Sequence, residues 1–292
     1  MSNVNCEYCS NEMSFARTTC PHCGRPSNFP NVRLAQFSDE KTALQARYDA
    51  SVKEAKGNGS ATNLQAFEAA VSQSNAVFAC PFAKLQPLTA PGRDIYETYY
   101  QLGDLRCQAR LKKAGEPDWD GIRPQAETAM FRDKNISDKI HYASLSLTDC
   151  GIKSYGECHI WLRGDLIAHR TSTFEGNSIL FFRERDTRIF QDDPVPPGHR
   201  STWEDRASLA VAKLGNQVDS QTQTADFDGI LLKAGENTLE DDFIELHVYG
   251  SVSLWTIQQI TVFVKRNRPG KVQLRVLKER LQQANCTLKV VS

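Results

Sequence analysis

The spacing of hydrophobic residues between positions 33 and 79 predicts two helices. Leu34, Phe37, Leu44 and Tyr48 recur at roughly helical intervals in a segment from about residue 33 to 56, which is rich in good helix formers. Residues 57–60, Gly-Asn-Gly-Ser, then interrupt the pattern. A second helical pattern follows from about residue 62 to 79. Because a short polar turn joins the two patterns, we expect an antiparallel helical hairpin within residues 31–88.

Beyond residue 89 the pattern changes to short strands separated by a few helices. Alternating or β-branched segments predict strands at residues 140–147, 158–162, 178–182, 243–249, 257–264 and 287–291. Helical patterns lie at residues 94–113, 124–132 and 272–284, and Ser-Thr-Trp-Glu at 201–204 predicts a capping box that opens a helix to about residue 214. Residues 89–292 are therefore expected to form an α+β domain.

Four of the nine cysteines lie in two Cys-x-x-Cys pairs near the start of the chain. Cys6 and Cys9 form the first pair, Cys20 and Cys23 form the second, and ten residues separate the pairs. Each turn directs two thiolates at one centre, and a module this short has too little apolar core to fold without a metal. The sequence thus predicts a zinc ribbon over residues 1–30, with one structural Zn²⁺ held by these four thiolates.

Charge and composition exclude several classes of protein. Lys plus Arg and Asp plus Glu both number 35, so no overall basic excess marks a nucleic-acid coat or a membrane-surface protein. No apolar run approaches the roughly 20 residues that span a bilayer, and the start of the chain lacks signal-peptide regions, so we expect a cytoplasmic protein without membrane contact. Neither a Walker nor a Rossmann glycine motif is present, and no hydrolase elbow surrounds a serine.

Two polar segments of the expected α+β domain carry candidate chemistry. The first is Arg-Thr-Ser-Thr-Phe-Glu-Gly-Asn-Ser at 170–178, and the second is Asp-Asp-Phe-Ile-Glu-Leu-His-Val-Tyr-Gly at 241–250. Together they resemble the core of the ADP-ribosyltransferase-like proteins, especially the bacterial toxin-type DarT group, over roughly residues 120–265. The resemblance implies a split β-sheet in which a Ser/Thr-rich strand lies beside a later strand that bears a catalytic glutamate.

The resemblance also assigns roles to individual residues. Glu245 takes the place of the catalytic glutamate, and His247, two positions further on, would face the acceptor. NAD, the implied substrate, would be held by Arg170 at its pyrophosphate, by the hydroxyls of Thr171, Ser172 and Thr173, and by His141 and Tyr142 on the first strand, with Arg123 as the alternative there. Glu-Leu-His replaces the Glu-x-Glu of arginine-specific members, which leaves the acceptor open.

The expected function is ADP-ribosyl transfer from NAD to a macromolecule, either nucleic acid or protein, by a toxin or phage-defence effector that an inhibitory protein partner holds in check. The alternative is a non-enzymatic zinc-ribbon adaptor that binds nucleic acid or a protein. Plain structural roles also fit the residues: Glu245 as a solvated strand residue, and Arg170 as the ion-pair partner of Glu175.

Overall fold

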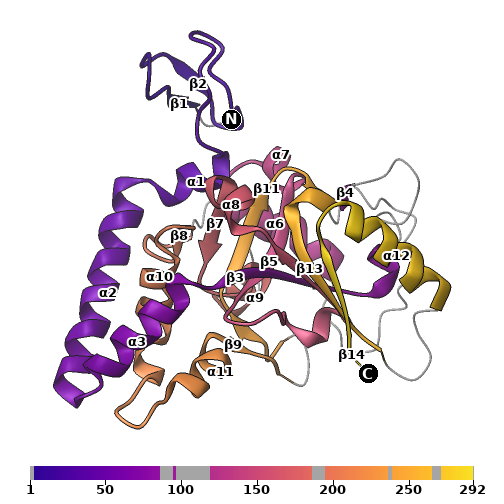
Figure 1. Cartoon of the computed structure of the whole chain (residues 1–292). Coiled ribbons are helices and arrows are strands. Elements are labelled where there is room, and N and C mark those ends of the chain that lie inside the picture. Colours follow the sequence, from indigo (N-terminus) through magenta and orange to yellow (C-terminus); the bar gives the residue numbers. More distant parts are fainter. Residues whose placement is uncertain are drawn as a thin grey trace.

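The computed structural model describes residues 3–85, 95–96, 119–185, 195–235, 239–264 and 271–291. Its centre is an eight-stranded sheet in the order β14-β13-β6-β3-β5-β11-β7-β8 (Figure 1). In that order the strands are Thr287–Val291, Ile257–Phe263, Cys158–Leu162, Asn75–Cys80, Ile140–Ser146, Glu245–Tyr249, Thr171–Phe174 and Arg200–Thr202. Neighbours pair antiparallel except β13 and β14, which pair parallel. The mixed α+β class is confirmed, and eight of the described strands form one continuous sheet instead of the expected split one.

One face of this sheet carries the main apolar core. Leu145, Leu246 and Val248 point to this face, and helices α2 (Ser38–Asn58), α3 (Ala61–Ser72), α10 (Arg206–Leu214) and α12 (Lys271–Gln283) contribute to the same cluster of buried side chains. Phe67 and Phe227, the latter from α11 (Phe227–Leu231), meet edge to face with ring centroids 5.4 Å apart.

A second, smaller core lies on the opposite face. Helices α1 (Pro30–Ala35), α6 (Trp119–Phe131), α7 (Lys134–Ser137) and α9 (Ser178–Arg185) supply side chains to it, and Phe174 and Tyr249 supply it from the sheet. Every second residue of a strand faces the same side of the sheet. This second core therefore borders polar side chains of β5, β7 and β11 that point to the same face. The face is thus partly apolar and partly polar, which is where a binding site can form.

Shorter elements connect these layers. The two-stranded pairs are β1 (Asn3–Asn5) with β2 (Glu12–Ser14), β9 (Leu232–Lys233) with β10 (Asp242–Phe243), and β4 (Ile95–Tyr96) with β12 (Val252–Ser253). The remaining helix is α8 (Gly164–Ile167), and 3-10 turns occupy Phe82–Leu85, Lys153–Tyr155, Ala168–Arg170, Gly215–Gln217, Thr224–Asp226 and Leu254–Thr256. Among the described residues, none of the helices combines the length and hydropathy that crossing a membrane requires.

The two expected helices of the first third are α2 and α3, with the separate short helix α1 before them. Gly59, at φ +79°, ends α2 in the left-handed conformation that glycine adopts easily. The prediction of helix through residue 79 is wrong, because Asn75–Cys80 form the central strand β3. Strands β5 and β6 pair with its two edges, and Ala76, Val77 and Phe78 are buried whichever face they point to. Its apolar run therefore carries no alternation that would distinguish a strand from a helix.

Two further predictions of local structure are wrong. Residues 178–182 belong to helix α9 and not to a strand, because the Asn177 Oδ1 accepts hydrogen bonds from the backbone N–H groups of Ile179 and Leu180, at 3.0 and 3.1 Å. Ser201 and Thr202 lie in β8, and the following helix begins only at Arg206. The expected strands at 140–147, 158–162, 257–264 and 287–291 and the helix near 272–284 are confirmed, whereas the helix expected at 94–113 falls mostly outside the described residues.

Candidate functional site

The N-terminal cysteines converge on one point. The four sulfur atoms of Cys6, Cys9, Cys20 and Cys23 all lie within 4.8 Å of one another. The Cys6 to Cys23 and Cys9 to Cys20 sulfur separations are 3.8 and 3.6 Å. A tetrahedron with metal–sulfur bonds of about 2.3 Å has edges of about 3.8 Å, so these thiolates fit a closed four-sulfur metal site. The predicted ligand set is therefore brought together as a candidate structural metal centre.

The two knuckles around these cysteines use the same backbone turn. In the first, Ser10 at φ +57° donates its N–H to the Cys6 carbonyl, and in the second Gly24 at φ +70° donates to the Cys20 carbonyl, both at 2.9 Å. The amide of Asn11 donates to the Cys9 sulfur at 3.6 Å. His22 is exposed and its ring lies 3.1 Å from the Glu12 carbonyl.

The second candidate site lies in the middle of the sheet, at Glu245 and His247 on β11. Both residues face the same side because they are two positions apart on one strand. The side chains are buried, with 5% and 2% of their surface exposed, and His247 Nε2 lies 2.8 Å from the Glu245 Oε1. Since a carboxylate only accepts hydrogen bonds, Nε2 is the donor. The backbone N–H of Ser178, at the start of α9, donates to the same carboxylate oxygen at 3.3 Å.

Strands β5 and β7 add polar side chains beside this pair. The register places Ser144 and Phe174 opposite Glu245, and Tyr142 and Ser172 opposite His247, so all these side chains share one face. The His247 ring is enclosed by aromatic rings, with centroids at 5.0 Å for Phe131, 5.3 Å for Tyr142 and 6.2 Å for Phe174. Such packing fixes the plane of the imidazole, and the imidazole in turn fixes the carboxylate of Glu245.

Tyr142 links this group to helix α6. Its hydroxyl donates to the Glu127 Oε1 at 2.8 Å, and Arg123 reaches the same oxygen at 3.2 Å. Burial and the neighbouring Glu127 charge raise the pKa of Tyr142 well above its usual range. The phenol therefore remains protonated and serves as a fixed hydrogen-bond donor.

Other residues singled out in the sequence lie away from Glu245. Thr171 and Thr173 alternate with Ser172 and face the main core, where the Thr171 hydroxyl donates to the Ile167 carbonyl at 2.8 Å. His141 pairs with Val248 on that same side, and burial, together with the Arg170 charge, lowers its pKa to about 4. The predicted hydroxyl triplet and His141 are therefore not gathered at the carboxylate.

Arg170 is held by backbone groups. Its guanidinium donates to the Tyr249 carbonyl and, at 3.3 Å, to the Leu166 carbonyl, and burial lowers its pKa. The ion pair expected with Glu175 is not formed, since Glu175 instead binds Arg47 at 2.7 Å and also contacts His199. The alternative interpretation of Glu245 as a solvated residue is also wrong, because Glu245 is buried.

Three neighbours of the pair were missed in the sequence: Asn31, Glu127 and Ser178. Asn31 is 1% exposed and its side-chain amide lies 2.8 Å from the His247 carbonyl and 3.2 Å from the Ser172 hydroxyl. Nothing in the sequence brings position 31 to positions 172 and 247. The Asn-Ser step at 177–178 was the one local signal for a helix start near the glutamate.

Tyr155 and Asn177 are partly exposed residues near the Glu–His pair. Tyr155 is 37% exposed, and its hydroxyl accepts a hydrogen bond from the Asn177 amide at 2.8 Å. Burial and the negative charge of Glu245 raise the pKa of Tyr155 above its usual range. Tyr155 is therefore a partly exposed residue close enough to Glu245 to feel its charge.

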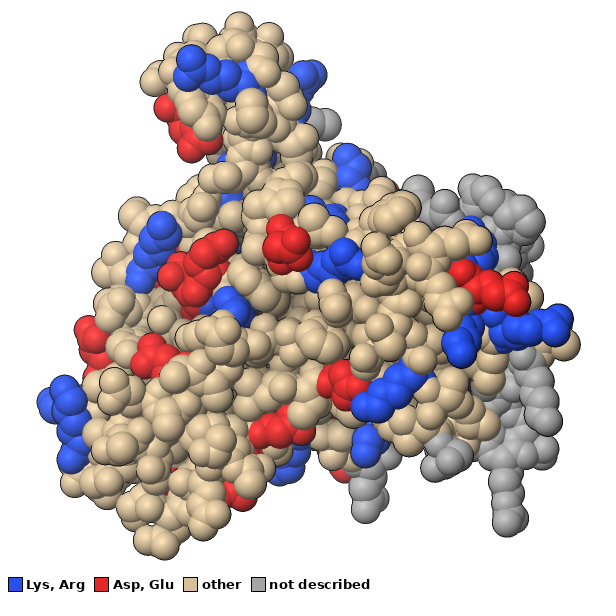
Figure 2. All heavy atoms as spheres, in the orientation of Figure 1, with Lys and Arg blue, Asp and Glu red and all other residues tan. Residues whose placement is uncertain are grey.

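The face of the molecule shown in Figure 2 carries charges of both signs. On the face shown in Figure 2, described lysines and arginines are interspersed with aspartates and glutamates, on the ribbon as well as on the sheet domain. Recognition of a charged ligand there depends on individual side chains.

The fold and the two clusters define a mixed α+β protein with a four-cysteine ribbon and a buried Glu–His pair on its sheet. No model of a known protein family matches the sequence, and the search of curated proteins finds no match.

Proposed function

We propose that the chain is an NAD-dependent ADP-ribosyltransferase whose catalytic residue is Glu245. The observation that carries the proposal is the register of β11 against β7, which sets Ser172 directly opposite His247, two residues from Glu245, on one buried polar face. A Ser/Thr-bearing strand beside a glutamate-bearing strand is the arrangement that the resemblance to ADP-ribosyltransferases implies. A toxin or phage-defence role in the cytoplasm, with an inhibitory partner, follows from that resemblance alone.

The chemistry requires a carboxylate held close to the nicotinamide ribose. Loss of nicotinamide leaves positive charge on the ribose ring, and a fixed carboxylate stabilises this charge as it develops. The His247 Nε2–H and the Ser178 N–H already orient the carboxylate of Glu245. Its reorientation during the reaction therefore costs little free energy. Because Glu245 is 5% exposed, NAD must displace side chains that cover it before it can reach the carboxylate.

The test is release of free nicotinamide from NAD by the purified chain, with RNA, DNA or protein supplied as acceptor. Glu245→Gln keeps the shape and an acceptor oxygen for the Ser178 N–H, so the variant should fold normally. Its loss of charge should lower the rate about 10²-fold or more, which corresponds to about 3 kcal/mol of transition-state stabilisation. Glu204→Gln, an exposed glutamate, is the matched control. Full activity in Glu245→Gln, or no NAD cleavage by the wild type with any acceptor, contradicts the proposal.

We also propose zinc as the metal of the four-cysteine site, since a closed tetrahedral set of four thiolates is typical of structural zinc. All four positions are used by protein, which leaves no open position for water or substrate. The metal therefore shapes the ribbon and takes no part in NAD cleavage.

The second candidate function is an adaptor in which the ribbon binds a partner and the sheet is a scaffold. Two observations favour it. The ribbon projects from the rest of the molecule (Figure 1). Tyr8 is 51% exposed, and the Arg25 guanidinium lies 5.1 Å from its ring centroid. Partner binding that is lost in Tyr8→Ala and retained in Glu245→Gln, with no NAD cleavage, would support this function.

A further inference from the structure

Asn31 makes an unusual set of contacts for a residue that immediately follows a metal ribbon. Its Nδ2 lies 2.8 Å from the His247 carbonyl, 3.1 Å from the Arg170 carbonyl and 3.2 Å from the Ser172 hydroxyl. Two of these partners are carbonyl oxygens, which only accept hydrogen bonds, so the amide nitrogen must face them. The Asn31 Oδ1 is left buried without a hydrogen-bond partner. The side chain thus spans β7 and β11 at the two polar residues beside Glu245.

The start of helix α1 fixes this side chain in place. Pro30 occupies the first turn, where its restricted φ favours the helix and its missing N–H costs nothing. The preceding Phe29 packs against Tyr249, at the end of β11, with ring centroids 5.2 Å apart. Any displacement of α1 would therefore move the Asn31 amide relative to both strands.

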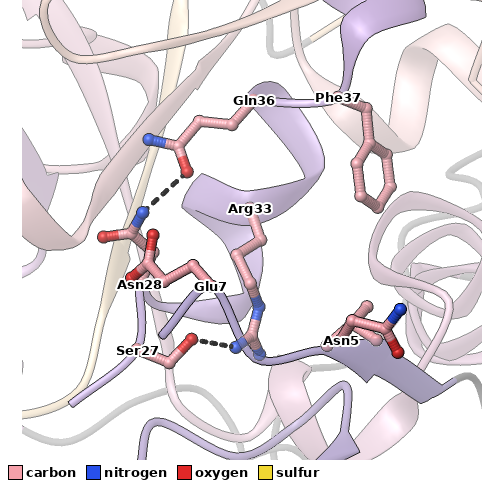
Figure 3. A pocket seen from close by; sticks show the side chains of 8 residues that line it. Asn5, Glu7, Ser27, Asn28, Arg33, Gln36 and Phe37 are labelled. Atoms are coloured by element: carbon pink, nitrogen blue, oxygen red, sulfur yellow. Dashed lines mark hydrogen bonds between the residues drawn. The ribbon is translucent and has the colours of Figure 1, made fainter. Parts of the chain in front are cut away.

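Two residues further along α1, Arg33 holds the ribbon. Its guanidinium donates to the Ser27 hydroxyl and to the Arg17 carbonyl, both at 2.9 Å, and also to the Phe15 carbonyl. Figure 3 shows Arg33 reaching Ser27 beside a cavity of about 320 Å³ between the ribbon and α1. Successive helical residues are rotated by about 100°, so Asn31 and Arg33 point in nearly opposite directions from the same turn.

We propose that Asn31 is a positioning residue for Ser172 and His247, and that Arg33 makes its position depend on the folded, metal-bound ribbon. The ribbon and the Glu–His pair are then coupled through one turn of helix. Arg33 gives α1 three hydrogen bonds to the ribbon, and it carries this coupling together with the packing of Phe15 in the second core. The positioning of His247 stands without the NAD reaction, and only its kinetic consequence rests on the proposed function.

The first test observes the His247 ring by NMR in the full chain labelled at histidine, with its signal assigned by His247→Gln. Asn31→Ala should shift the His247 ring signals and leave those of His22 unchanged. Asn63→Ala is the matched control, because the Asn63 amide also donates to a distant backbone carbonyl, that of Asp219 at 2.9 Å. A folded Asn31→Ala with an unshifted His247 signal would overturn the proposal, even if its unfolding temperature falls, since lower stability alone shows only a structural role.

The second test needs no substitution at Asn31. Removing the metal from the wild-type chain with a chelator should shift the His247 signal in the same direction as Arg33→Met, which keeps the stem of the side chain and removes its donors. In Asn31→Ala the chelator should add no further shift, because the link is already broken. If the His247 signal of the wild type does not shift when the metal is removed, the coupling is refuted, whether or not Asn31→Ala folds.

Kinetics separate this inference from the proposed function. If NAD is cleaved, Asn31→Ala should lower kcat about 10- to 100-fold with little change in KM, as expected when a reacting group is misplaced. If NAD is not cleaved but the His247 signal responds as described, the proposed function fails and the coupling stands.

Discussion

Loss of the metal should unfold the ribbon and spare the sheet. Cys20→Ser removes one of four thiolates from a closed tetrahedral site, and three thiolates leave that site incomplete. We expect the wild-type chain to carry one zinc ion and the variant to carry none.

The size of the effect follows from what else holds the ribbon together. Apart from its cysteines, the ribbon's own core consists of Met13 with Val4 packed against it. Burial of these two side chains contributes about 2–5 kcal/mol, while ordering about twenty residues costs about 20 kcal/mol. Binding of structural zinc contributes about 10–16 kcal/mol net of this ordering cost, so the metal supplies the stability that the small core lacks. Without the metal, the deficit is too large for a folded ribbon.

The sheet domain has its own cores and loses mainly the packing of Phe15, the ribbon residue that lies in the second core. Metal analysis by mass spectrometry, amide NMR spectra and a thermal unfolding curve together test this expectation. Ribbon amide signals in Cys20→Ser should collapse to unfolded positions while the main cooperative transition remains. Dispersed ribbon signals in a chain shown to be free of metal, with its thiols reduced, would refute the reasoning.

Two further predictions concern the sheet domain. Burial and the Arg170 charge lower the pKa of His141 from 6.5 to about 4, so the unfolded chain binds this proton at a higher pH than the folded chain does. The free energy of unfolding should therefore fall as pH drops from 6.5 towards 4, by about 3 kcal/mol at most. Urea titrations should show a smaller fall in His141→Gln. An equal fall in the variant would contradict the role given to His141. Gly156 adopts φ +150°, and an added Cβ would lie 2.1 Å from the Cys80 carbonyl carbon, so Gly156→Ala should destabilise by about 1–3 kcal/mol or more. At Gly57 an added Cβ meets nothing within 4 Å, so Gly57→Ala should stabilise helix α2 by about 0.5–1 kcal/mol. Equal melting temperatures of Gly156→Ala and Gly57→Ala would contradict the clash expected at Gly156.

Local features of the molecule could be predicted from the sequence because short stretches determine them. The spacing of Cys6, Cys9, Cys20 and Cys23 sets the candidate metal centre, since each knuckle is a single turn. Strands such as Ile140–Ser146 and Ile257–Phe263 were predicted correctly from β-branched and aromatic residues. The proximity of Ser172 to the Glu245 strand was also predicted, though from a resemblance and not from spacing.

Only the tertiary structure decided which side chains surround Glu245. Side chains alternate along a strand, so Thr171 and Thr173 face away from Glu245 while Ser172 faces the same side as Glu245. Which of the two sets faces the glutamate depends on which face of the sheet the helices cover. The apolar run of β3 became a strand because β5 and β6 pair with both of its edges. Asn31 reaches Ser172 and His247 across 141 and 216 positions of sequence. Such contacts arise from packing between distant segments, and no periodicity within a short window records them.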